Sequence, residues 1–358
     1  MITLNKGEWS EIYVFLKLLA EGKLYAADAN RNKLPEIFHT VLSVVRSADD
    51  GNYEYLRNGS VRILNRSTEQ EEGTVSFEEV AKNAADLLTR IKTSTGSFDI
   101  GNIAHFLLKM KVNRLKAHST EKSDILLTVQ DTKSKAIHTL GFSIKSRLGS
   151  ASTLFNAQKA TNFIFKIDGN ISDALMNEIN SIETDSKIMD RVRKLNSSGC
   201  SLLYSDVEGR ILKNNLEIMD TNLPLILSEL LVICYREEVR NLAATTQCLV
   251  SENFMDRTGD VKSFYELKIK NFLKDVALGM TPQKPWTGNY DATGGYIIVK
   301  EDGEVISYNH SNINEFLNYL FNNTFFESPS SDRHGYGKVY KEGRNYFFKL
   351  NLQVRFKQ

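Results

Sequence analysis

Asp124 and Lys145 are the residues whose types and positions most directly suggest chemistry. Asp124 begins the segment DILLTVQD, and Lys145 lies near the end of IHTLGFSIKS, residues 137–146. Both segments read as strands, and the short polar stretch TKSKA between them reads as a turn. A lysine bracketed by apolar residues in a strand is unexpected, because its ammonium needs water or a partner. An acid on a neighbouring strand would provide that partner.

The two strands are expected to form an antiparallel hairpin with Gln130 opposite Ile137. This register places Asp124 opposite Ser143 and makes Lys145 a diagonal neighbour on the same face. A slip of one residue would move Asp124 to the other face, so the prediction depends on the register.

A carboxylate and an ammonium placed in this way can hydrolyse a phosphodiester. The carboxylate of Asp124 can hold a hard divalent cation such as Mg²⁺. The ammonium of Lys145 can orient a water molecule and stabilise charge that develops on a phosphate. The structural alternative is that Asp124 caps the strand and Lys145 extends from a sheet edge into water.

The arrangement resembles the PD-(D/E)xK nuclease core, in which an acid on one strand precedes an acid-x-Lys motif on the next. Here the motif reads Ser143-Ile144-Lys145, so a serine stands where the family usually has an acid. A hydroxyl binds Mg²⁺ more weakly than a carboxylate does. A second acid is therefore expected from another part of the chain.

Glu11 is the candidate for this second acid. Residues 9–22 have apolar side chains at helical spacing, and the predicted helix ends near Gly22. Glu11 falls on the apolar arc beside Phe15 and Leu18, where a carboxylate needs a partner or a cation. The alternative is a salt bridge to a lysine, or a position at the rim of the core.

Three long blocks resemble the HpaII-type type II restriction endonucleases. They are GEWSEIYVFLKLLAEGKLYAAD (7–28), LGFSIKSRLGSASTLFNAQKATNF (140–163), and residues 294–356, which begin GGYIIVKEDGEV and end YFFKLNLQVRF. The resemblance covers both ends of the chain and the hairpin. It implies Mg²⁺-dependent hydrolysis of double-stranded DNA at a short palindrome, CCGG, with 5′-phosphate ends.

The resemblance also implies roles for the residues of the hairpin. Asp124, Glu11 and the carbonyl of Ile144 would hold the metal ion. Ser143 would be a secondary polar ligand or a water contact, and Lys145 would orient the attacking water.

Two other functions stay open at this point. One is a structure-specific or repair nuclease that uses the same core. The other is a DNA-binding module with a decayed nuclease core, which the missing acid at Ser143 suggests. A palindromic site favours a homodimer on DNA, because matched half-sites require matched protein surfaces; a monomer that nicks the strands in turn is the alternative.

Basic residues gather near the C-terminus. Between Arg333 and Gln358 there are seven Lys or Arg and one acid, although the whole chain carries a net charge of only +1. In residues 346–357 apolar and polar side chains alternate, as in a half-buried strand. The polar face offers phosphate and base contacts through Lys349, Asn351, Gln353 and Arg355. The alternative is an ordinary solvated sheet face.

Two loops offer further DNA contacts. Ser146, Arg147 and Ser150 follow the catalytic strand, where a loop and the N-terminus of a helix are expected to bind a phosphate. Arg147 can instead bond the edge of a guanine, and helix capping would explain one or two of the hydroxyls. Arg333 and His334 lie in the glycine-rich segment SDRHGYG and are expected to contact DNA.

The composition is that of a soluble globular protein, with 41% hydrophobic and 25% charged residues among 358. The three cysteines fit neither a disulfide framework nor a zinc site, which favours a reducing bacterial cytoplasm. The most apolar segment, residues 223–234, is too short to span a bilayer, so no membrane partner is expected.

The order of expected elements predicts an α/β (α+β) fold, and the resemblance implies a PD-(D/E)xK-type mixed sheet flanked by helices. Residues 1–170 are expected to form the nuclease core, with a helix over 101–116. Residues 171–281 read as a helical insertion, and residues 282–358 as a mainly β, basic part that contacts DNA. This last part can also form one compact domain with the core.

Overall fold

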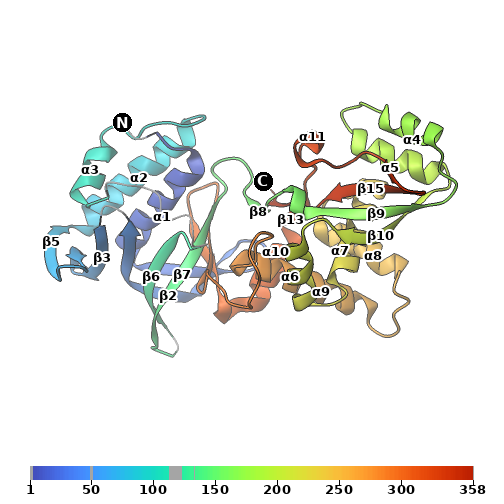
Figure 1. Cartoon of the computed structure of the whole chain (residues 1–358). Coiled ribbons are helices and arrows are strands. Elements are labelled where there is room, and N and C mark those ends of the chain that lie inside the picture. Colours follow the sequence, from blue (N-terminus) through green and yellow to red (C-terminus); the bar gives the residue numbers. More distant parts are fainter. Residues whose placement is uncertain (1–2, 49–50, 113–122, 133, 358) are drawn as a thin grey trace. The chain divides into compact units, whose positions relative to one another are not determined.

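The computed structural model describes residues 3–48, 51–112, 123–132 and 134–357. The chain divides into two compact units, each built from two stretches of sequence (Figure 1). Unit 1 comprises residues 1–152 and 290–319, together with residue 358, and unit 2 comprises residues 153–289 and 320–357. The three-part division at residues 170 and 281 stays a prediction.

Unit 1 is a large mixed sheet with helices packed against it. Its helices are α1 (Lys6–Glu21), α2 (Phe77–Thr93), α3 (Ile103–Lys109) and most of α10 (Ile313–Asn322). Its strands are β1 (Lys23–Ala27), β2 (Lys33–Ala48), β3 (Gly51–Asn58), β4 (Ser60–Asn65), β5 (Gln70–Val75), β6 (Ile125–Asp131), β7 (Ile137–Ser146), β11 (Gly295–Val299) and β12 (Val305–Tyr308). The mixed sheet with flanking helices confirms the predicted fold class.

The sheet has the strand order β1-β12-β11-β7-β6-β2-β3-β4-β5. Strand β1 also pairs with β2, so six of the strands follow one another in a closed ring of pairings. Strand β7 is one of these six strands and lies between β6 on one side and β11 on the other. The strand with the candidate lysine is therefore held along both of its edges.

Helix α1 forms where its sequence predicts a helix. Asn5 caps its N-terminus and exchanges hydrogen bonds with Glu8, and Gly22 ends it with φ 69°, a left-handed conformation that favours glycine. The apolar face, including Trp9 and Leu16, is completely buried in the core of unit 1. Burial of this face, more than helix propensity, stabilises the helix in its position.

The predicted helix over residues 101–116 is wrong in its length. Helix α3 ends at Lys109, and Lys111 adopts a left-handed conformation with φ 57° that stops the helical turn. The last residues of the prediction, 113–116, lie outside the described part of the chain.

Unit 2 combines two small sheets with a group of helices. Its helices are α4 (Asp173–Asn180), α5 (Lys187–Ser197), α6 (Arg210–Met219), α7 (Leu223–Glu237), α8 (Leu242–Glu252), α9 (Val261–Leu278) and α11 (Ser331–His334). One sheet has the order β10 (Ser201–Val207), β9 (Asn162–Asp168), β15 (Asn345–Asn351) and β14 (Tyr340–Glu342). The other has the order β13 (Thr324–Phe326), β16 (Val354–Phe356) and β8 (Thr153–Phe155).

Helix α7 is the buried helix of unit 2, and Pro224 lies in its first turn as predicted. None of the described helices is by itself long and apolar enough to cross a membrane. Helices α6 and α7 reach that threshold only as a pair, with a bend of 108° between them.

The segment after β7 corrects one prediction. A loop and a helix were expected over residues 147–160, but the chain forms strand β8 and then one 3₁₀ turn, Lys159–Thr161. The apolar side chains of Leu154 and Phe155 are buried, and Phe155 pairs with Val354 of β16. Pairing in a sheet thus replaces the expected helix.

The end of the chain corrects a second prediction. Residues 346–357 were expected to alternate along one strand, but β15 ends at Asn351 and β16 begins at Val354, in a different sheet. Between them Leu352 N–H donates to the carbonyl of Thr161, and the carbonyl of Gln353 accepts from Glu327 N–H. These bonds satisfy the backbone where the chain passes from one sheet to the other.

Candidate active site

The β6–β7 hairpin has the predicted register. Gln130 pairs with Ile137, and the ladder continues without a shift to Ile125 opposite Phe142. Asp124 is the next residue beyond the paired strand, and its N–H donates to the carbonyl of Phe142 at 2.8 Å. The alternation of apolar residues in both strands therefore selected the correct pairing.

The carboxylate of Asp124 meets the Ser-x-Lys motif of β7. Its Oδ2 atom accepts a hydrogen bond from the backbone N–H of Ile144 at 2.6 Å and another from the Ser143 hydroxyl at 3.1 Å. Two donors therefore orient this carboxylate, and within the described part of the chain no donor reaches its Oδ1 atom. Ser143 supports the acid of the neighbouring strand at the place where the family pattern has a second acid.

Lys145 lies two residues after Ser143 in β7, and its side chain is half-buried. Its ammonium lies 5.4 Å from the centre of the Tyr296 ring. No carboxylate of the described residues forms an ion pair with it. An aromatic face attracts a cation without neutralising it, so the charge of Lys145 stays available.

Sequence reasoning missed Tyr296. It belongs to β11, which runs parallel to β7 and pairs Tyr296 with Ser143 and Ile298 with Lys145. Burial raises the pKa of the Tyr296 hydroxyl, and the charge of Asp124 raises it further. In sequence Tyr296 is one residue of a short apolar run, and only the long-range pairing of β11 with β7 reveals its position.

Helix α1 joins β7 through two hydroxyl groups. Ser10 and Ser146 are both buried, and their Oγ atoms are 2.7 Å apart. Glu11 follows Ser10 in the helix and is half-buried, near the rim of the apolar face. The structure thus brings the helix of Glu11 against β7, the strand of Lys145, and the role of Glu11 in binding a metal stays a prediction.

The chemistry of the donors suits Mg²⁺. In a strand the N–H and C=O of one residue point to the same side, so the carbonyl of Ile144 points to the side from which Asp124 approaches its N–H. A carboxylate, a carbonyl and a hydroxyl are hard oxygen donors, which Mg²⁺ prefers. The described residues contain no group of three or more His, Cys, Asp or Glu that could hold a metal ion.

The loop after β7 places its predicted DNA contacts differently. Arg147 donates from Nε to Glu301 at 2.5 Å, and only 10% of its side chain is exposed. Ser146 is buried beneath α1, whereas Ser150 is exposed. Ser150 and Lys6 both line a hollow of about 850 Å³ in unit 1. No helix begins in this loop, so the expected phosphate site at a helix N-terminus is wrong.

Unit 2 buries one of the predicted contacts. Asn351 is completely buried, and its amide donates to the carbonyl of Gln158 at 2.7 Å and to Asn162 Oδ1 at 2.6 Å. Its expected position on a solvent face is therefore wrong, because the amide satisfies neighbouring backbone and side-chain groups. Lys349 is half-buried and forms an ion pair with Glu208 at 3.1 Å.

The remaining predicted contacts lie nearer the surface. Gln353 and Arg355 are half-buried, and Arg355 forms an ion pair with Glu327 at 3.4 Å. Arg333 is exposed at the end of α11. His334 beside it is half-buried, and burial together with the charge of Arg333 lowers its pKa.

Comparisons with known proteins agree with this geometry. The model of the HpaII restriction endonuclease family matches residues 5–356. The type II restriction enzyme HpaII of Haemophilus parainfluenzae is 41% identical over 355 residues, which cover 98% of each chain. No solved structure matches. Both matches extend over nearly the whole chain. We conclude that the chain belongs to the HpaII restriction endonuclease family.

Proposed function

We propose that this restriction endonuclease hydrolyses double-stranded DNA at CCGG with Mg²⁺ and leaves 5′-phosphate ends. The observation that carries the proposal is the double hydrogen bond to Asp124 Oδ2 from Ser143 and Ile144, with Lys145 next on the same strand. This arrangement supports the proposal because it anchors an acid to the strand that carries the lysine, the two groups that phosphodiester hydrolysis would use.

Each residue of the proposed site has one role. Asp124 and the Ile144 carbonyl would hold Mg²⁺, together with Glu11 from α1. Bound Mg²⁺ would supply Lewis acidity toward a phosphate oxygen. Ser143 keeps Asp124 in one orientation through its hydrogen bond. The ring of Tyr296 limits where the ammonium of Lys145 can lie.

Lys145 would orient a water molecule opposite the 3′-oxygen of the scissile phosphate. The bond from the water oxygen to phosphorus forms while the bond from phosphorus to the 3′-oxygen breaks. The water loses a proton to solvent and the 3′-oxygen gains one, which gives a 3′-hydroxyl and a 5′-phosphate. The ammonium stabilises the charge that develops on the phosphate during this step.

The palindrome favours a homodimer on DNA, in which each copy cuts one strand. We place the enzyme in the bacterial cytoplasm, where its DNA substrate lies. The orientation of Asp124 by two donors favours an active enzyme over a decayed nuclease core, because a group that no longer acts has no need of such support. Family membership likewise favours a restriction enzyme over a structure-specific nuclease.

Plasmid cleavage tests the proposal. The protein is incubated with plasmid DNA and Mg²⁺, and the fragment ends are sequenced. Discrete fragments with 5′-phosphates that start within CCGG support the proposal. Ends at another sequence would overturn the proposed site, and cleavage restricted to branched or damaged DNA would favour a repair nuclease.

A further inference from the structure

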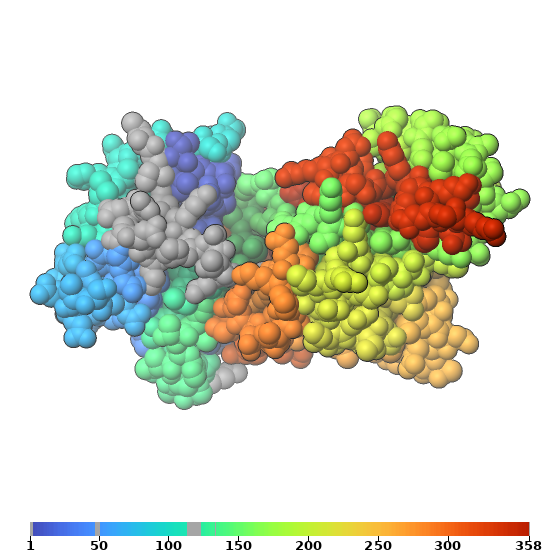
Figure 2. All heavy atoms as spheres, viewed as in Figure 1, coloured from blue at the N-terminus to red at the C-terminus, as the bar shows by residue number. Residues whose placement is uncertain are grey.

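The segment from Arg333 to Lys338, here called the 333–338 loop, combines exposed cations with a fixed backbone. Arg333 and Lys338 are exposed, whereas Tyr336 and Gly337 between them are buried. Neither cation forms an ion pair with any residue that the structure describes. In the space-filling view the C-terminal residues lie at the surface beside the segment of α4 and α5 (Figure 2). The charges of this loop are thus open to a partner.

Two other lysines of the C-terminal segment have carboxylate partners. Lys341 lies 2.9 Å from Asp173, and Lys349 lies 3.1 Å from Glu208. These pairs neutralise charge, whereas Arg333 and Lys338 keep theirs. Lys341 and Lys349 therefore form ion pairs within the protein, whereas Arg333 and Lys338 are available to bind an anion.

Hydrogen bonds hold the backbone of the loop at both ends. Near its start, the Asn162 amide donates to the carbonyl of His334 at 2.9 Å. Just beyond its end, Asn180 exchanges two bonds with the backbone of Val339, each of 2.8 Å. In the middle, Gly337 N–H donates to the carbonyl of Lys349 at 2.9 Å. A loop held in this way presents its side chains with little loss of conformational entropy on binding.

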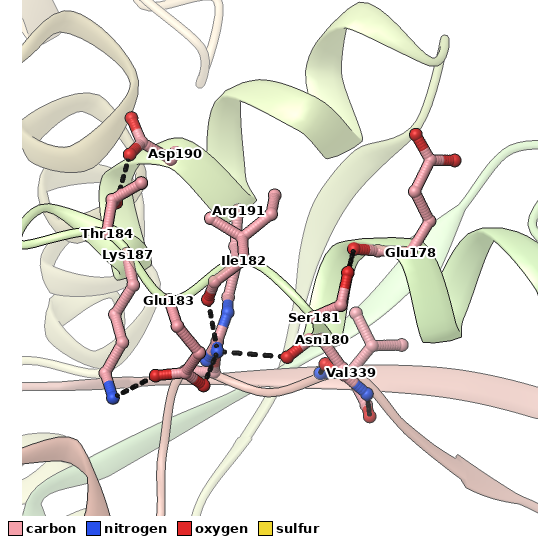
Figure 3. A network of polar contacts seen from close by, with 11 residues as sticks. Glu178, Asn180, Ser181, Ile182, Glu183, Thr184, Lys187, Asp190, Arg191 and Val339 are labelled. Carbon is pink, nitrogen blue, oxygen red and sulfur yellow. Dashed lines mark hydrogen bonds and ion pairs between the residues drawn. The ribbon is translucent and has the colours of Figure 1, made fainter.

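Arg191 of α5 supplies the central contact (Figure 3). Its side chain is completely buried, and Nη1 donates to the carbonyl of Gly337 at 2.6 Å. Nη2 donates to the carbonyls of Asn180 and Ile182 and to the carboxylate of Glu183, which is 2.8 Å away. One guanidinium therefore joins the loop before α5 to the 333–338 loop.

A buried arginine is a costly way to stabilise a fold. Replacing a whole buried ion pair by apolar side chains of similar volume is often neutral or stabilising, whereas removing one partner alone is strongly destabilising. Gly337 adds a second constraint, because its φ is +81° and a Cβ atom there would lie 2.1 Å from the side chain of Ile188. The contact of Arg191 with Gly337 thus fixes one particular loop conformation.

We propose that Arg333 and Lys338 contact backbone phosphates of double-stranded DNA, and that Arg191 is the positioning residue of this contact. The loop borders a groove of about 440 Å³ whose lining includes Lys338, Tyr340 and one carboxylate, Asp332. The inference rests on the proposed function in one respect, that the substrate is duplex DNA. It adds a contact surface in unit 2 that is separate from the hydrolytic residues of unit 1.

Salt dependence of DNA binding tests the phosphate contacts. Binding of wild type, Arg333→Gln, Lys338→Gln and the double variant to a CCGG duplex and to an unrelated duplex is measured by fluorescence anisotropy at several salt concentrations, without divalent metal. Each lost phosphate contact should lower the slope of log affinity against log salt by about 0.9. Affinity for both duplexes should fall by the same factor. Lys341→Gln is the matched control, because Lys341 is already paired, and its slope should equal that of wild type.

Arg191→Lys tests the positioning role. It keeps the charge but loses the planar donor geometry, so it should lower the salt slope although it leaves Arg333 and Lys338 in place. When combined with the Arg333 and Lys338 double variant, it should cause no further loss of affinity. Asn180→Ala, which removes the bonds to Val339, provides the same measurement if Arg191→Lys does not fold.

The outcomes are distinct. Unchanged slopes in the Arg333 and Lys338 variants overturn the inference, as does a loss of affinity limited to the CCGG duplex, which would indicate base reading. Additive losses with Arg191→Lys overturn its positioning role. If wild type cleaves at CCGG but the salt slopes of the Arg333 and Lys338 variants equal that of wild type, only this inference fails. If wild type cleaves no DNA, the proposed function itself fails.

Discussion

Lys145 in unit 1 and Arg191 in unit 2 are both cations set into their folds, but their surroundings differ. Arg191 is completely buried and donates to three carbonyls and one carboxylate. Lys145 is half-buried and lies against an aromatic ring, without an ion pair to any described carboxylate. The guanidinium of Arg191 donates hydrogen bonds within the protein, whereas the ammonium of Lys145 remains able to donate to another molecule.

The two environments lead to different expectations. A cation that donates to several acceptors within the fold contributes to stability and to the placement of backbone, and its loss should be felt in unfolding. A cation without such partners contributes little to stability, and its loss should be felt in activity. The following predictions test this difference.

The largest effect is expected from Lys145→Ala. Cleavage of plasmid DNA with Mg²⁺ should fall by a factor of at least about 10² to 10³, because one preorganised charge at the reacting phosphate is lost. Duplex binding and the unfolding midpoint should stay near those of wild type. Lys300→Ala is the control and should cleave like wild type, since Lys300 follows β11 but is paired with Glu304. Full activity of Lys145→Ala would exclude the proposed site.

Arg191→Met should produce the opposite pattern. Its free energy of unfolding in urea should fall by about 2–4 kcal/mol, because buried carbonyls lose their donor. The folded variant should bind DNA more weakly, as is expected for Arg191→Lys. Its single-turnover cleavage rate at saturating protein should stay near that of wild type, since Arg191 does not belong to the hydrolytic cluster. An unfolding curve identical to that of wild type would show that Arg191 and Lys145 do not differ in this way.

Tyr296 should give an intermediate effect. Tyr296→Leu removes the aromatic face beside Lys145, and single-turnover cleavage should slow by about 5- to 20-fold, in line with the strength of a cation–π contact. Tyr296→Phe keeps the ring and should cleave at nearly the wild-type rate. Equal rates in the two variants would mean that the ring does not hold the ammonium.

The smallest effect concerns pH. Burial lowers the pKa of His39, which is held between Asn309 and Asp131 in the sheet of unit 1. The pKa of His39 in the folded state is therefore below the ordinary histidine value of 6.5, which we take for the unfolded state, so the unfolded chain binds the proton first. Stability should be full above pH 6.5 and should decrease as the pH falls below it. His39→Gln should flatten this part of the stability profile in urea titrations.

Much of the β6–β7 hairpin could be predicted because its signals are local. The alternation in two strands with a short turn between them leaves few registers, and a slip of one residue would move one strand's apolar set, such as Leu127 and Val129, to the other face. Helix α1 was equally clear, because its apolar arc and its terminal Gly22 fall within one short segment.

Other features depend on distant parts of the chain. Tyr296 reaches Lys145 only because β11 pairs with β7 across an insertion of more than one hundred residues. Asn351 looks exposed in an alternating strand, but Gln158 and Asn162 hold its amide inside unit 2. Periodicity reports the spacing of side chains along one strand and carries no information about such partners.

The divided sequence of unit 1 has a consequence for its synthesis. The hairpin of Asp124 and Lys145 leaves the ribosome early, but β11, which completes the surroundings of Lys145, follows only after residues 153–289 have been made. A nascent chain that stops before Gly295 lacks this neighbouring strand. Products truncated before Gly295 contain Asp124 and Lys145 without the strand that places Tyr296 beside Lys145.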